Sequence, residues 1–248
     1  MTKDTDSLTS MFQLAGRVAI VAGGAGAIGG AIGRRLQECG AKAYCLDVRA
    51  RACPDGMTAI ACDLANPAEI SKSIADIDRR EGRLDILVHA AGITRDARLW
   101  KSSIDDWNLV LTTNLGSAFA LLHATVPVMR RTGGGQIVLI SSINGERGKV
   151  GQASYAASKA GLNALARTSA REVGAFGIRV NVVAPGWIDT PMTADVPADV
   201  RQRAVEESAL GHIGKPDDVA RATVFLVSDL SRHVTGQVLR VDGGQLIG

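Results

Sequence analysis

The chain has 248 residues, of which 46% are hydrophobic and 21% charged, and its formal net charge is +3. This composition suits one well-buried domain, and the mild, dispersed positive charge does not favour nucleic-acid binding. The N-terminus, MTKDTDSLTSMFQLAG, has early aspartates and no apolar run, which excludes a signal peptide. No stretch approaches the roughly 18 apolar residues of a membrane span. We therefore expect a cytoplasmic protein that binds neither nucleic acid nor membrane.

The four cysteines all lie in the first quarter of the chain: Cys39, Cys45, Cys53 and Cys62. They form no C-x-x-C motif and have no paired histidines, so no metal site is expected. The sequence predicts buried or incidental thiols in a reducing compartment.

Residues 1–14 are expected to form a flexible extension, and residues 15–248 a single domain in which short apolar runs alternate with helical periodicities. Near-continuous apolar strands that alternate with helices are typical of a parallel sheet covered on both faces. The sequence therefore predicts an α/β fold, a doubly wound (Rossmann) sheet of about seven strands. Strands are expected at 17–23, 41–48, 57–64, 84–92, 135–142, 178–186 and 236–244, and helices at 28–40, 67–82, 104–114, 115–131, 217–229 and around Tyr155 and Lys159.

A glycine-rich turn, V-A-G-G-A-G-A-I-G-G, lies between the first strand and the first helix. Gly24, Gly26 and Gly29 follow the G-x-G-x-x-G spacing, which is weak by itself but gains weight from its place between a strand and a helix. Such a turn lets the backbone approach a pyrophosphate at the N-terminus of the helix.

Asp47 ends the second predicted strand, about 20 residues after the glycine turn. A carboxylate at this position hydrogen-bonds the adenosine ribose hydroxyls and repels a 2′-phosphate, which favours NAD over NADP. Arg49 and Arg51 follow closely and could instead bind that phosphate. Asp63, at the end of the third strand, fits two roles equally well: a helix N-cap or a contact with the adenine amine.

Tyr155 and Lys159 lie one helical turn apart in S-Y-A-A-S-K, and the chain has only two tyrosines. Positions i and i+4 share one face of a helix, so the ammonium can stand beside the phenol. Taken alone, the pair favours the simpler interpretation, an amphipathic helix on which the two residues coincide.

Five segments in the right order resemble the short-chain dehydrogenase/reductase family, over nearly all of residues 15–247. The turn A-G-G-A-G-A-I-G resembles the family's T-G-x-x-x-A/G-x-G, and Ser142, Tyr155 and Lys159 have the family's spacing. Ala22, His89 and Ala90 depart from the pattern, which we expect to affect the rigidity of the turn and sheet rather than the chemistry. The other matching segments are H-A-A-G (89–92), N-L-G-S-A-F (114–119) and A-P-G-W-I-D-T-P-M (184–192).

The resemblance implies the residues of the site. The catalytic set would be Asn114, Ser142, Tyr155 and Lys159, with Asn114 binding a water that links Lys159 to solvent. Lys159 would also hold the nicotinamide ribose. The implied cofactor contacts are Gly23, Gly26, Ala27, Ile28, Gly29, Asp47, Asp63, Leu64, Ala91, Gly92, Tyr155, Lys159, Pro185, Gly186, Ile188 and Thr190.

Interconverting an alcohol and a ketone requires a proton transfer that the protein must supply. A free tyrosine has a pKa near 10, which is too high for it to act as a general base at neutral pH. A positive charge about 4 Å away is worth roughly 4 kcal/mol at an effective dielectric constant near 20, or about three pKa units. We therefore predict that Lys159 lowers the pKa of Tyr155. Ser142 would donate to the substrate oxygen, whereas Ser141 would point to the opposite side of the strand.

Within the family the resemblance is strongest to reductases of 3-oxoacyl thioesters, acting on acyl carrier protein or coenzyme A. Those enzymes mostly prefer NADPH, whereas Asp47 favours NAD. We expect substrate contacts from Ser142, Asn144, Gln152, Tyr155 and Trp187. Segment 191–214 is expected to form a mobile lid, with Trp187 and Met192 as pocket walls.

The sequence thus predicts an NAD(H)-dependent oxidoreductase that interconverts a secondary alcohol and a ketone, a 3-oxoacyl thioester reductase or 3-hydroxyacyl dehydrogenase. Three alternatives remain: a dehydrogenase of a small secondary or cyclic alcohol, a non-catalytic NAD-binding sensor, and a sugar-nucleotide epimerase, which this chain is too short to match. The family also implies a homotetramer built through the fourth and fifth helices and the last strand, although periodicity does not exclude a dimer.

Overall fold

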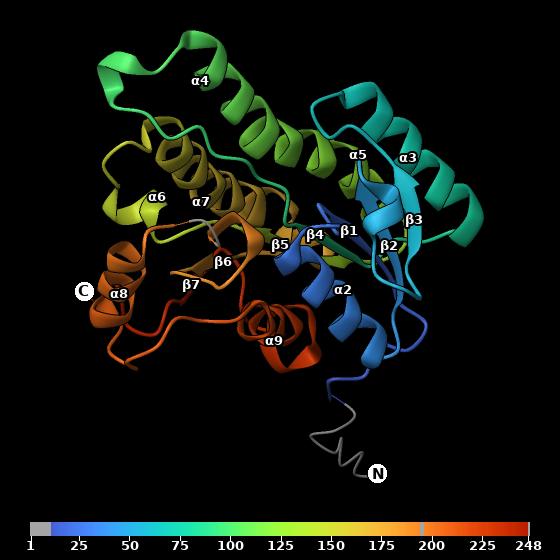
Figure 1. Cartoon of the computed structure of the whole chain (residues 1–248). Helices are drawn as coiled ribbons and strands as arrows, with labels where there is room; N and C mark the ends of the chain where they lie inside the picture. Colours follow the sequence, from blue (N-terminus) through green and yellow to red (C-terminus); the bar gives the residue numbers. More distant parts are fainter. Residues whose placement is uncertain (1–10, 194–195, 248) are drawn as a thin grey trace.

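The computed structural model describes residues 11–193 and 196–247. Its centre is one parallel sheet of seven strands in the order β3-β2-β1-β4-β5-β6-β7, which Figure 1 shows. The predicted doubly wound sheet is confirmed. The strands are β1 (Val18–Ala22), β2 (Lys42–Asp47), β3 (Thr58–Ala61), β4 (Ile86–His89), β5 (Gly135–Ile140), β6 (Ile178–Pro185) and β7 (Val238–Val241).

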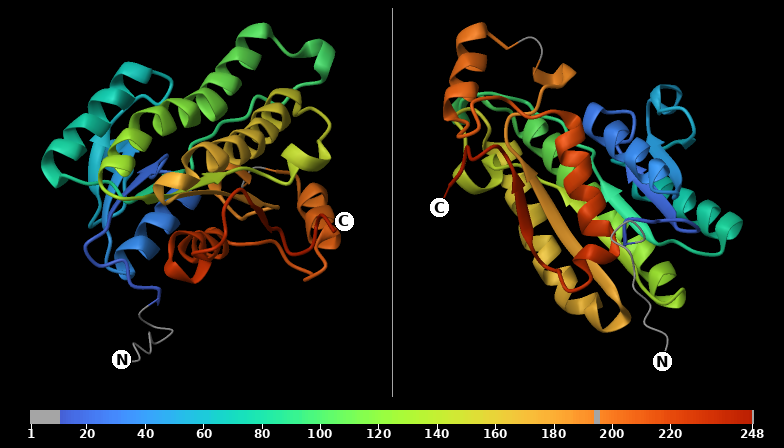
Figure 2. Two further views of the ribbon diagram at one scale, coloured as in Figure 1. Left: turned by 180° about the vertical axis from the view of Figure 1, so that it is seen from behind. Right: turned by 90° about the horizontal axis from the view of Figure 1, so that it is seen from below.

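Helices cover both faces of the sheet (Figure 2). One apolar cluster joins α3, α5 and α7 to the sheet, and a second joins α2 and α9 to its other face. Each βαβ crossover thereby buries an apolar stripe of its helix. The helices are α2 (Ala27–Glu38), α3 (Pro67–Glu81), α4 (Ile104–Leu111), α5 (Ser117–Arg131), α6 (Asn144–Arg147), α7 (Ala153–Val173), α8 (Ala198–Glu207) and α9 (Pro216–Val227).

The folded domain begins earlier than the sequence predicts. Leu14 is fully buried, and its backbone N–H donates to the carbonyl oxygen of Cys39 at 2.7 Å. Leu14 therefore belongs to the core beside α2 and not to a flexible extension. Residues 1–10, the rest of that predicted extension, lie outside the described residues.

The segment predicted as a lid has more regular structure than expected. Helix α8 occupies part of it, and the Arg147 guanidinium reaches Glu207 at the end of α8 at 3.0 Å. Its apolar content is too low for the pattern to reveal this helix, which buries only Ala204. Residues 194–195 and the side chain of Met192 lie outside the described part, and mobility stays a prediction.

The expectation of four incidental thiols is wrong, because Cys45 and Cys53 form a disulfide. After β2 the chain turns back through a short helical turn, Ala50–Ala52, which brings the two Cα atoms to 6.2 Å. That separation lies in the normal range for a disulfide. Cys39 and Cys62 are free.

Helices α4 and α5 continue into one another through a π-helical turn, Thr112–Gly116. The combined helix, Ile104–Arg131, is long and apolar enough to cross a membrane, so the expectation that no stretch reaches this level is wrong on length and composition. In this fold the helix belongs to the layer over the sheet, where Leu121 is fully buried. Such a core helix passes the same test, which makes it weak evidence for a membrane span.

Candidate active site

The glycine turn after β1 is packed too closely for side chains at three positions, Gly23, Gly24 and Gly29. Gly23 has φ +81°, and a Cβ added there would lie 2.5 Å from the backbone nitrogen of Ala91. A Cβ at Gly29 would lie 2.2 Å from the carbonyl oxygen of Gly23. The turn therefore folds tightly onto itself and onto the end of β4, and leads directly into α2.

The N-terminus of α2 differs from those of α3 and α4. Asn66 caps α3 and Ser103 caps α4 through side-chain hydrogen bonds. The N-cap of α2 is Gly26, which has no side chain to cap the helix, and the first turn of α2 contains no acidic residue. Its first N–H groups lack intrahelical partners and carry the positive end of the helix dipole. This arrangement fits the phosphates of a dinucleotide.

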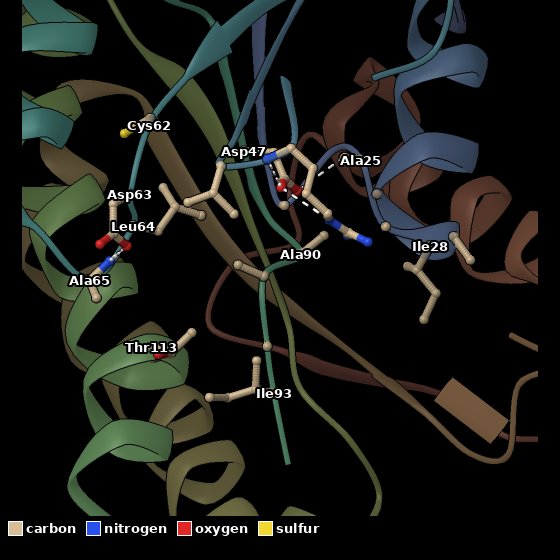
Figure 3. A pocket seen from close by; sticks show the side chains of 18 of the residues that line it. Ala25, Ile28, Asp47, Cys62, Asp63, Leu64, Ala65, Ala90, Ile93 and Thr113 are labelled. Atoms are coloured by element: carbon tan, nitrogen blue, oxygen red, sulfur yellow. Dashed lines mark hydrogen bonds and ion pairs between the residues drawn. The ribbon is translucent and has the colours of Figure 1, made fainter. Parts of the chain in front are cut away.

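A cavity of about 540 Å³ opens beside this helix N-terminus, at the carboxyl edge of the sheet. Figure 3 shows side chains from the ends of several strands around it. Eleven of the predicted cofactor residues line this one cavity: Gly23, Gly26, Ala27, Ile28, Gly29, Asp47, Asp63, Leu64, Ala91, Gly92 and Thr190. The predicted cofactor contacts did not include eight others: Ala25, Val48, Cys62, Ala65, Ala90, Ile93, Thr113 and Pro191.

Asp47 is held in place at one end of the cavity. One carboxylate oxygen accepts the backbone N–H of Ala25 at 3.2 Å, and the other accepts the N–H of Arg49 at 2.9 Å. The Arg49 guanidinium lies 3.6 Å from the same carboxylate and is itself exposed. Arg49 lines the cavity and Arg51 does not.

Asp63 is not a helix N-cap, because Asn66 fills that position in α3. The carboxylate of Asp63 instead accepts the backbone N–H of Ala65 at 2.9 Å, and the Asp63 N–H donates to Glu69 at 2.8 Å. The N-cap alternative was wrong because the helix begins at Pro67, as predicted, and the residue directly before it, Asn66, is its N-cap. The alternative role of Asp63, a contact with the adenine amine, stays a prediction.

Tyr155 and Lys159 both lie on α7, beside the end of β5. The Lys159 ammonium is buried and donates to the carbonyl oxygen of Ile140 at 2.9 Å. It lies 5.5 Å from the centre of the Tyr155 ring. A Cβ added at Gly92 would come within 3.2 Å of the Lys159 nitrogen, so the lysine also adjoins the cavity.

The expected lowering of the pKa of Tyr155 does not occur in this arrangement. Burial raises the pKa of Tyr155, the hydrogen bond with Ser142 opposes that rise, and the charge of Asp96 adds to it. Burial also lowers the pKa of Lys159 to about 8. The prediction was wrong because it counted the charge of the lysine and not the cost of burying both groups.

The serines at the end of β5 point in different directions, as a regular strand requires. The Ser141 hydroxyl donates to the carbonyl oxygen of Lys159 at 2.8 Å, within the protein. The Ser142 oxygen accepts the backbone N–H of Asn144 at 3.1 Å and adjoins Tyr155. Ser142 is thus the serine placed beside the phenol.

Asn114 lies in the π-helical turn and is fully buried. Its amide donates to the carbonyl oxygen of Ile93 and to the Ser158 hydroxyl, both at 3.0 Å, and accepts the Ile93 N–H at 2.8 Å. Ser158 in turn donates to the carbonyl oxygen of Tyr155. Both side-chain donors of Asn114 therefore hold the loop and α7 in place, and the predicted water stays a prediction.

Two predicted substrate residues, Asn144 and Gln152, contact each other. The Asn144 amide donates to the Gln152 carbonyl at 3.0 Å, and the Gln152 amide donates to Asp96 at 2.9 Å. Asp96 is exposed and lies in a loop without regular structure. No periodicity marks such a residue, and sequence reasoning missed it for that reason.

Only part of the segment that follows β6 lines the cavity. Gly186 packs against the C-terminal residues, since a Cβ there would lie 2.2 Å from Gln245. Ile188 is buried and faces Gly214. Neither these two nor Pro185 lines the cavity, whereas Thr190 does.

Trp187 is held at its backbone, where its N–H donates to Gln245 at 2.7 Å. The Lys149 ammonium lies 5.2 Å from the centre of the indole ring. The indole N–H is buried and has no hydrogen-bond partner among the described residues. Trp187 thus lies outside the cavity lining, and its indole N–H is available to donate a hydrogen bond to another partner.

His89, which departs from the family pattern, is part of the core. It is fully buried, and its Nε2 lies 2.7 Å from the Ser117 hydroxyl. Burial lowers its pKa to about 3, so the ring is neutral. His89 supports the end of β4 and provides no charge for the site.

The cavity thus suits a dinucleotide, and the residues beside its lining, Ser142, Tyr155 and Lys159, suit proton transfer. Together they define the class as a Rossmann-type, dinucleotide-dependent oxidoreductase. A family model described as enoyl-(acyl carrier protein) reductase matches residues 23–245. The chain belongs to the short-chain dehydrogenase/reductase family. It is an oxidoreductase that acts on CH–OH groups with a nicotinamide cofactor.

Several known proteins are similar over almost the whole chain. The 3-oxoacyl-(acyl-carrier-protein) reductase FabG of Thermotoga maritima is 38% identical, covering 95% of this chain and 100% of the relative. An acetoacetyl-CoA reductase of Shinella zoogloeoides is 39% identical, covering 92% and 98%. The crystal structure of a putative short-chain alcohol dehydrogenase from Sinorhizobium meliloti superposes with a TM-score of 0.91 at 31% identity, covering 95% and 98%.

Proposed function

We propose that the protein reduces the ketone of a 3-oxoacyl thioester, such as a 3-oxoacyl-ACP or acetoacetyl-CoA, to the hydroxyl with NADH. The observation that carries this proposal is that Ser142 adjoins Tyr155, on the same helix as Lys159, whose ammonium lies beside Gly92 of the dinucleotide cavity. The names of the relatives support the thioester as substrate.

The bound nicotinamide would supply or accept the hydride, and the residues of the chain would manage the oxygen and its proton. Ser142 would donate a hydrogen bond to the ketone oxygen and stabilise the charge that develops there. Tyr155 would deliver the proton to that oxygen. Because burial raises its pKa, the phenol stays protonated at neutral pH, and this form suits proton donation and hence reduction.

Lys159 would stand between the carbonyl of Ile140 and the nicotinamide ribose. Its position next to Gly92 supports this role, because Gly92 lines the cavity. Asn114 would act as a positioning residue, since it ties the loop after β4 to α7 through Ile93 and Ser158. Asn144, Gln152 and Trp187 would contact the substrate, for which the unpartnered indole N–H offers a donor.

Support for NAD over NADP comes from Asp47. Its carboxylate is buried to 7% exposure and is oriented by two backbone N–H groups at the end of the cavity. A 2′-phosphate placed beside it would meet a fixed negative charge. The opposing feature is Arg49, whose exposed guanidinium can reach a phosphate at the same end.

The test is to measure initial rates with acetoacetyl-CoA, with NADH and NADPH side by side. Turnover that prefers NADH supports both the thioester substrate and the role of Asp47. Turnover that prefers NADPH means that Arg49 outweighs Asp47, and the cofactor proposal fails. If neither cofactor gives turnover but NADH binds, the thioester substrate is wrong, and small secondary or cyclic alcohols are the next substrates to assay.

We also propose that the protein is a cytoplasmic homotetramer. The outer side of the α4–α5 helix exposes apolar residues, among them Leu109 at 42% and Phe119 at 60%, and a second copy would cover them. Light scattering coupled to size exclusion measures the assembly. A monomer at micromolar concentration would contradict this assignment.

A further inference from the structure

The Cys45–Cys53 disulfide lies at the end of the cavity proposed for the adenosine ribose. Cys45 precedes Asp47 by two residues in β2, and Cys53 follows the helical turn Ala50–Ala52. The ring closed by the disulfide therefore includes Asp47 and Arg49, which line the cavity. We propose that this disulfide is a reversible thiol–disulfide site whose oxidised form raises the affinity for the nicotinamide dinucleotide. The inference rests on the proposed function as an NAD-dependent enzyme.

The Cys45 sulfur and Asp47 both contact the glycine turn of the cavity. A Cβ added at Gly24 would lie 2.7 Å from the Cys45 sulfur, so that sulfur packs against the glycine turn. Asp47 is tied to the same turn through the N–H of Ala25. Since residues two apart in a strand point to the same side, the sulfur and the carboxylate of Asp47 approach the turn together.

Asp47 is held in β2 beside β3, whereas the loop that follows it, up to Cys53, has few other side-chain restraints. Val48 is 65% exposed, and Arg49 and Arg51 are exposed as well. The ion pair between Arg49 and Asp47 is at the surface, where such pairs contribute little. A covalent link across this loop restricts its conformations more than these contacts do. Opening the link would let Arg49 and the loop after Asp47 leave the arrangement beside the ribose, and would loosen the sulfur contact with the glycine turn that Asp47 also contacts.

The two sulfurs differ in access, which sets the course of reduction. Cys45 is fully buried and Cys53 is half-buried. A thiolate of a small dithiol attacks the Cys53 sulfur, the S–S bond breaks, and its electron pair passes to Cys45, which takes up a proton. The second thiolate of the dithiol then releases Cys53 as a thiol. The protein gains two electrons and two protons, and the dithiol becomes a cyclic disulfide.

A role as a redox site agrees with the compartment that the family implies. In a reducing cytoplasm, disulfides that do form are mostly transient or redox-sensing rather than structural. The oxidised form here would arise by exchange with a low-molecular-weight disulfide, the reverse of the reduction above.

The first experiment counts free thiols. The protein is equilibrated with oxidised glutathione, denatured, alkylated without reductant and weighed by mass spectrometry. We expect labels on Cys39 and Cys62 alone, which are free in the structure, and on all four cysteines after reduction. Labelling of all four, or glutathione adducts on Cys45 and Cys53 in place of the internal link, overturns the proposal.

The second experiment titrates NADH into oxidised and reduced protein and follows nicotinamide fluorescence. We expect binding to weaken about two- to tenfold on reduction, the effect of releasing one or two ordered side chains. Cys53→Ser should match the reduced protein in either condition. Cys39→Ser is the matched control and should keep the difference. The reduced wild-type protein needs no substitution, so a variant that fails to fold does not decide the result.

Equal affinities of the oxidised and reduced protein, with the disulfide verified, overturn this inference and leave the proposed function intact. Absence of NADH binding in both states, with the protein folded, overturns the proposed function itself and this inference with it.

Discussion

The two ends of the candidate site, the catalytic residues and the dinucleotide cavity beside them, are built in different ways. At the catalytic end, Tyr155 and Lys159 project from a long buried helix, and Lys159 is anchored to the backbone of β5. At the other end, Asp47 is the buried last residue of β2 and accepts two backbone N–H groups, and Arg49 lies in the exposed loop that follows, which a disulfide closes. The comparison teaches that a buried helix holds the proposed reacting groups, whereas the groups proposed to select the cofactor lie where a strand passes into a loop. The two ends should therefore respond differently to substitution.

Replacing the phenol gives the largest expected effect. Tyr155→Phe removes the proton donor without changing the shape of the site, and we expect the rate of acetoacetyl-CoA reduction to fall about 10²- to 10⁴-fold. NADH affinity, which depends on the other end, should stay within about threefold because the ring remains. Initial rates and an NADH titration measure the two effects. A rate within tenfold of wild type would assign the proton to another group.

Removing the Ser142 hydroxyl comes next. Ser142→Ala deletes the donor to the developing charge, so kcat should fall about 10²- to 10³-fold. Ser141→Ala is the matched control, because that hydroxyl binds the Lys159 carbonyl inside the protein. It should cost about 1 kcal/mol of stability and leave kcat within a few fold. Equal losses of kcat in the two variants would mean that the two serines do not differ in role.

At the loop end, Asp47→Asn should weaken NADH binding about tenfold, as expected for neutralising a charged hydrogen-bond acceptor. NADPH binding should improve, since the fixed negative charge is gone. Arg49→Ala is the companion change and should leave NADH affinity within about threefold because its ion pair is at the surface. Titrations with both cofactors decide the matter, and an unchanged NADH-to-NADPH ratio in Asp47→Asn would contradict the role of Asp47.

The smallest predicted effect is a change of stability with pH. The pKa of Lys159 is lowered to about 8 in the folded protein, so above that value the unfolded chain binds the proton that the folded chain has lost. By linkage this contribution raises the free energy of unfolding with pH, by up to about 1.4 kcal/mol per pH unit, until the unfolded lysine titrates near pH 10.4.

Urea unfolding at a series of pH values tests this slope. Lys159→Met should lack the contribution, so the difference in slope between the variant and the wild type isolates this one group. If the two slopes agree, Lys159 keeps an ordinary pKa in the folded protein, and its buried position is compensated by contacts other than the Ile140 carbonyl.

The sequence by itself determined the seven parallel strands, the glycine turn and the spacing of Tyr155 and Lys159. These features depend on short-range periodicity, which the order of residues states directly. Eleven predicted cofactor residues meet in one cavity for the same reason, because parallel strands end at one edge of the sheet.

Tertiary structure alone decided the pKa values and the pairings between distant segments. The pKa of Tyr155 depends on burial and on Asp96, which reaches the site through Gln152 from another loop. The Cys45–Cys53 disulfide depends on how the chain turns after β2. Burial and distance are sums over the whole fold, and no local pattern of residues carries them.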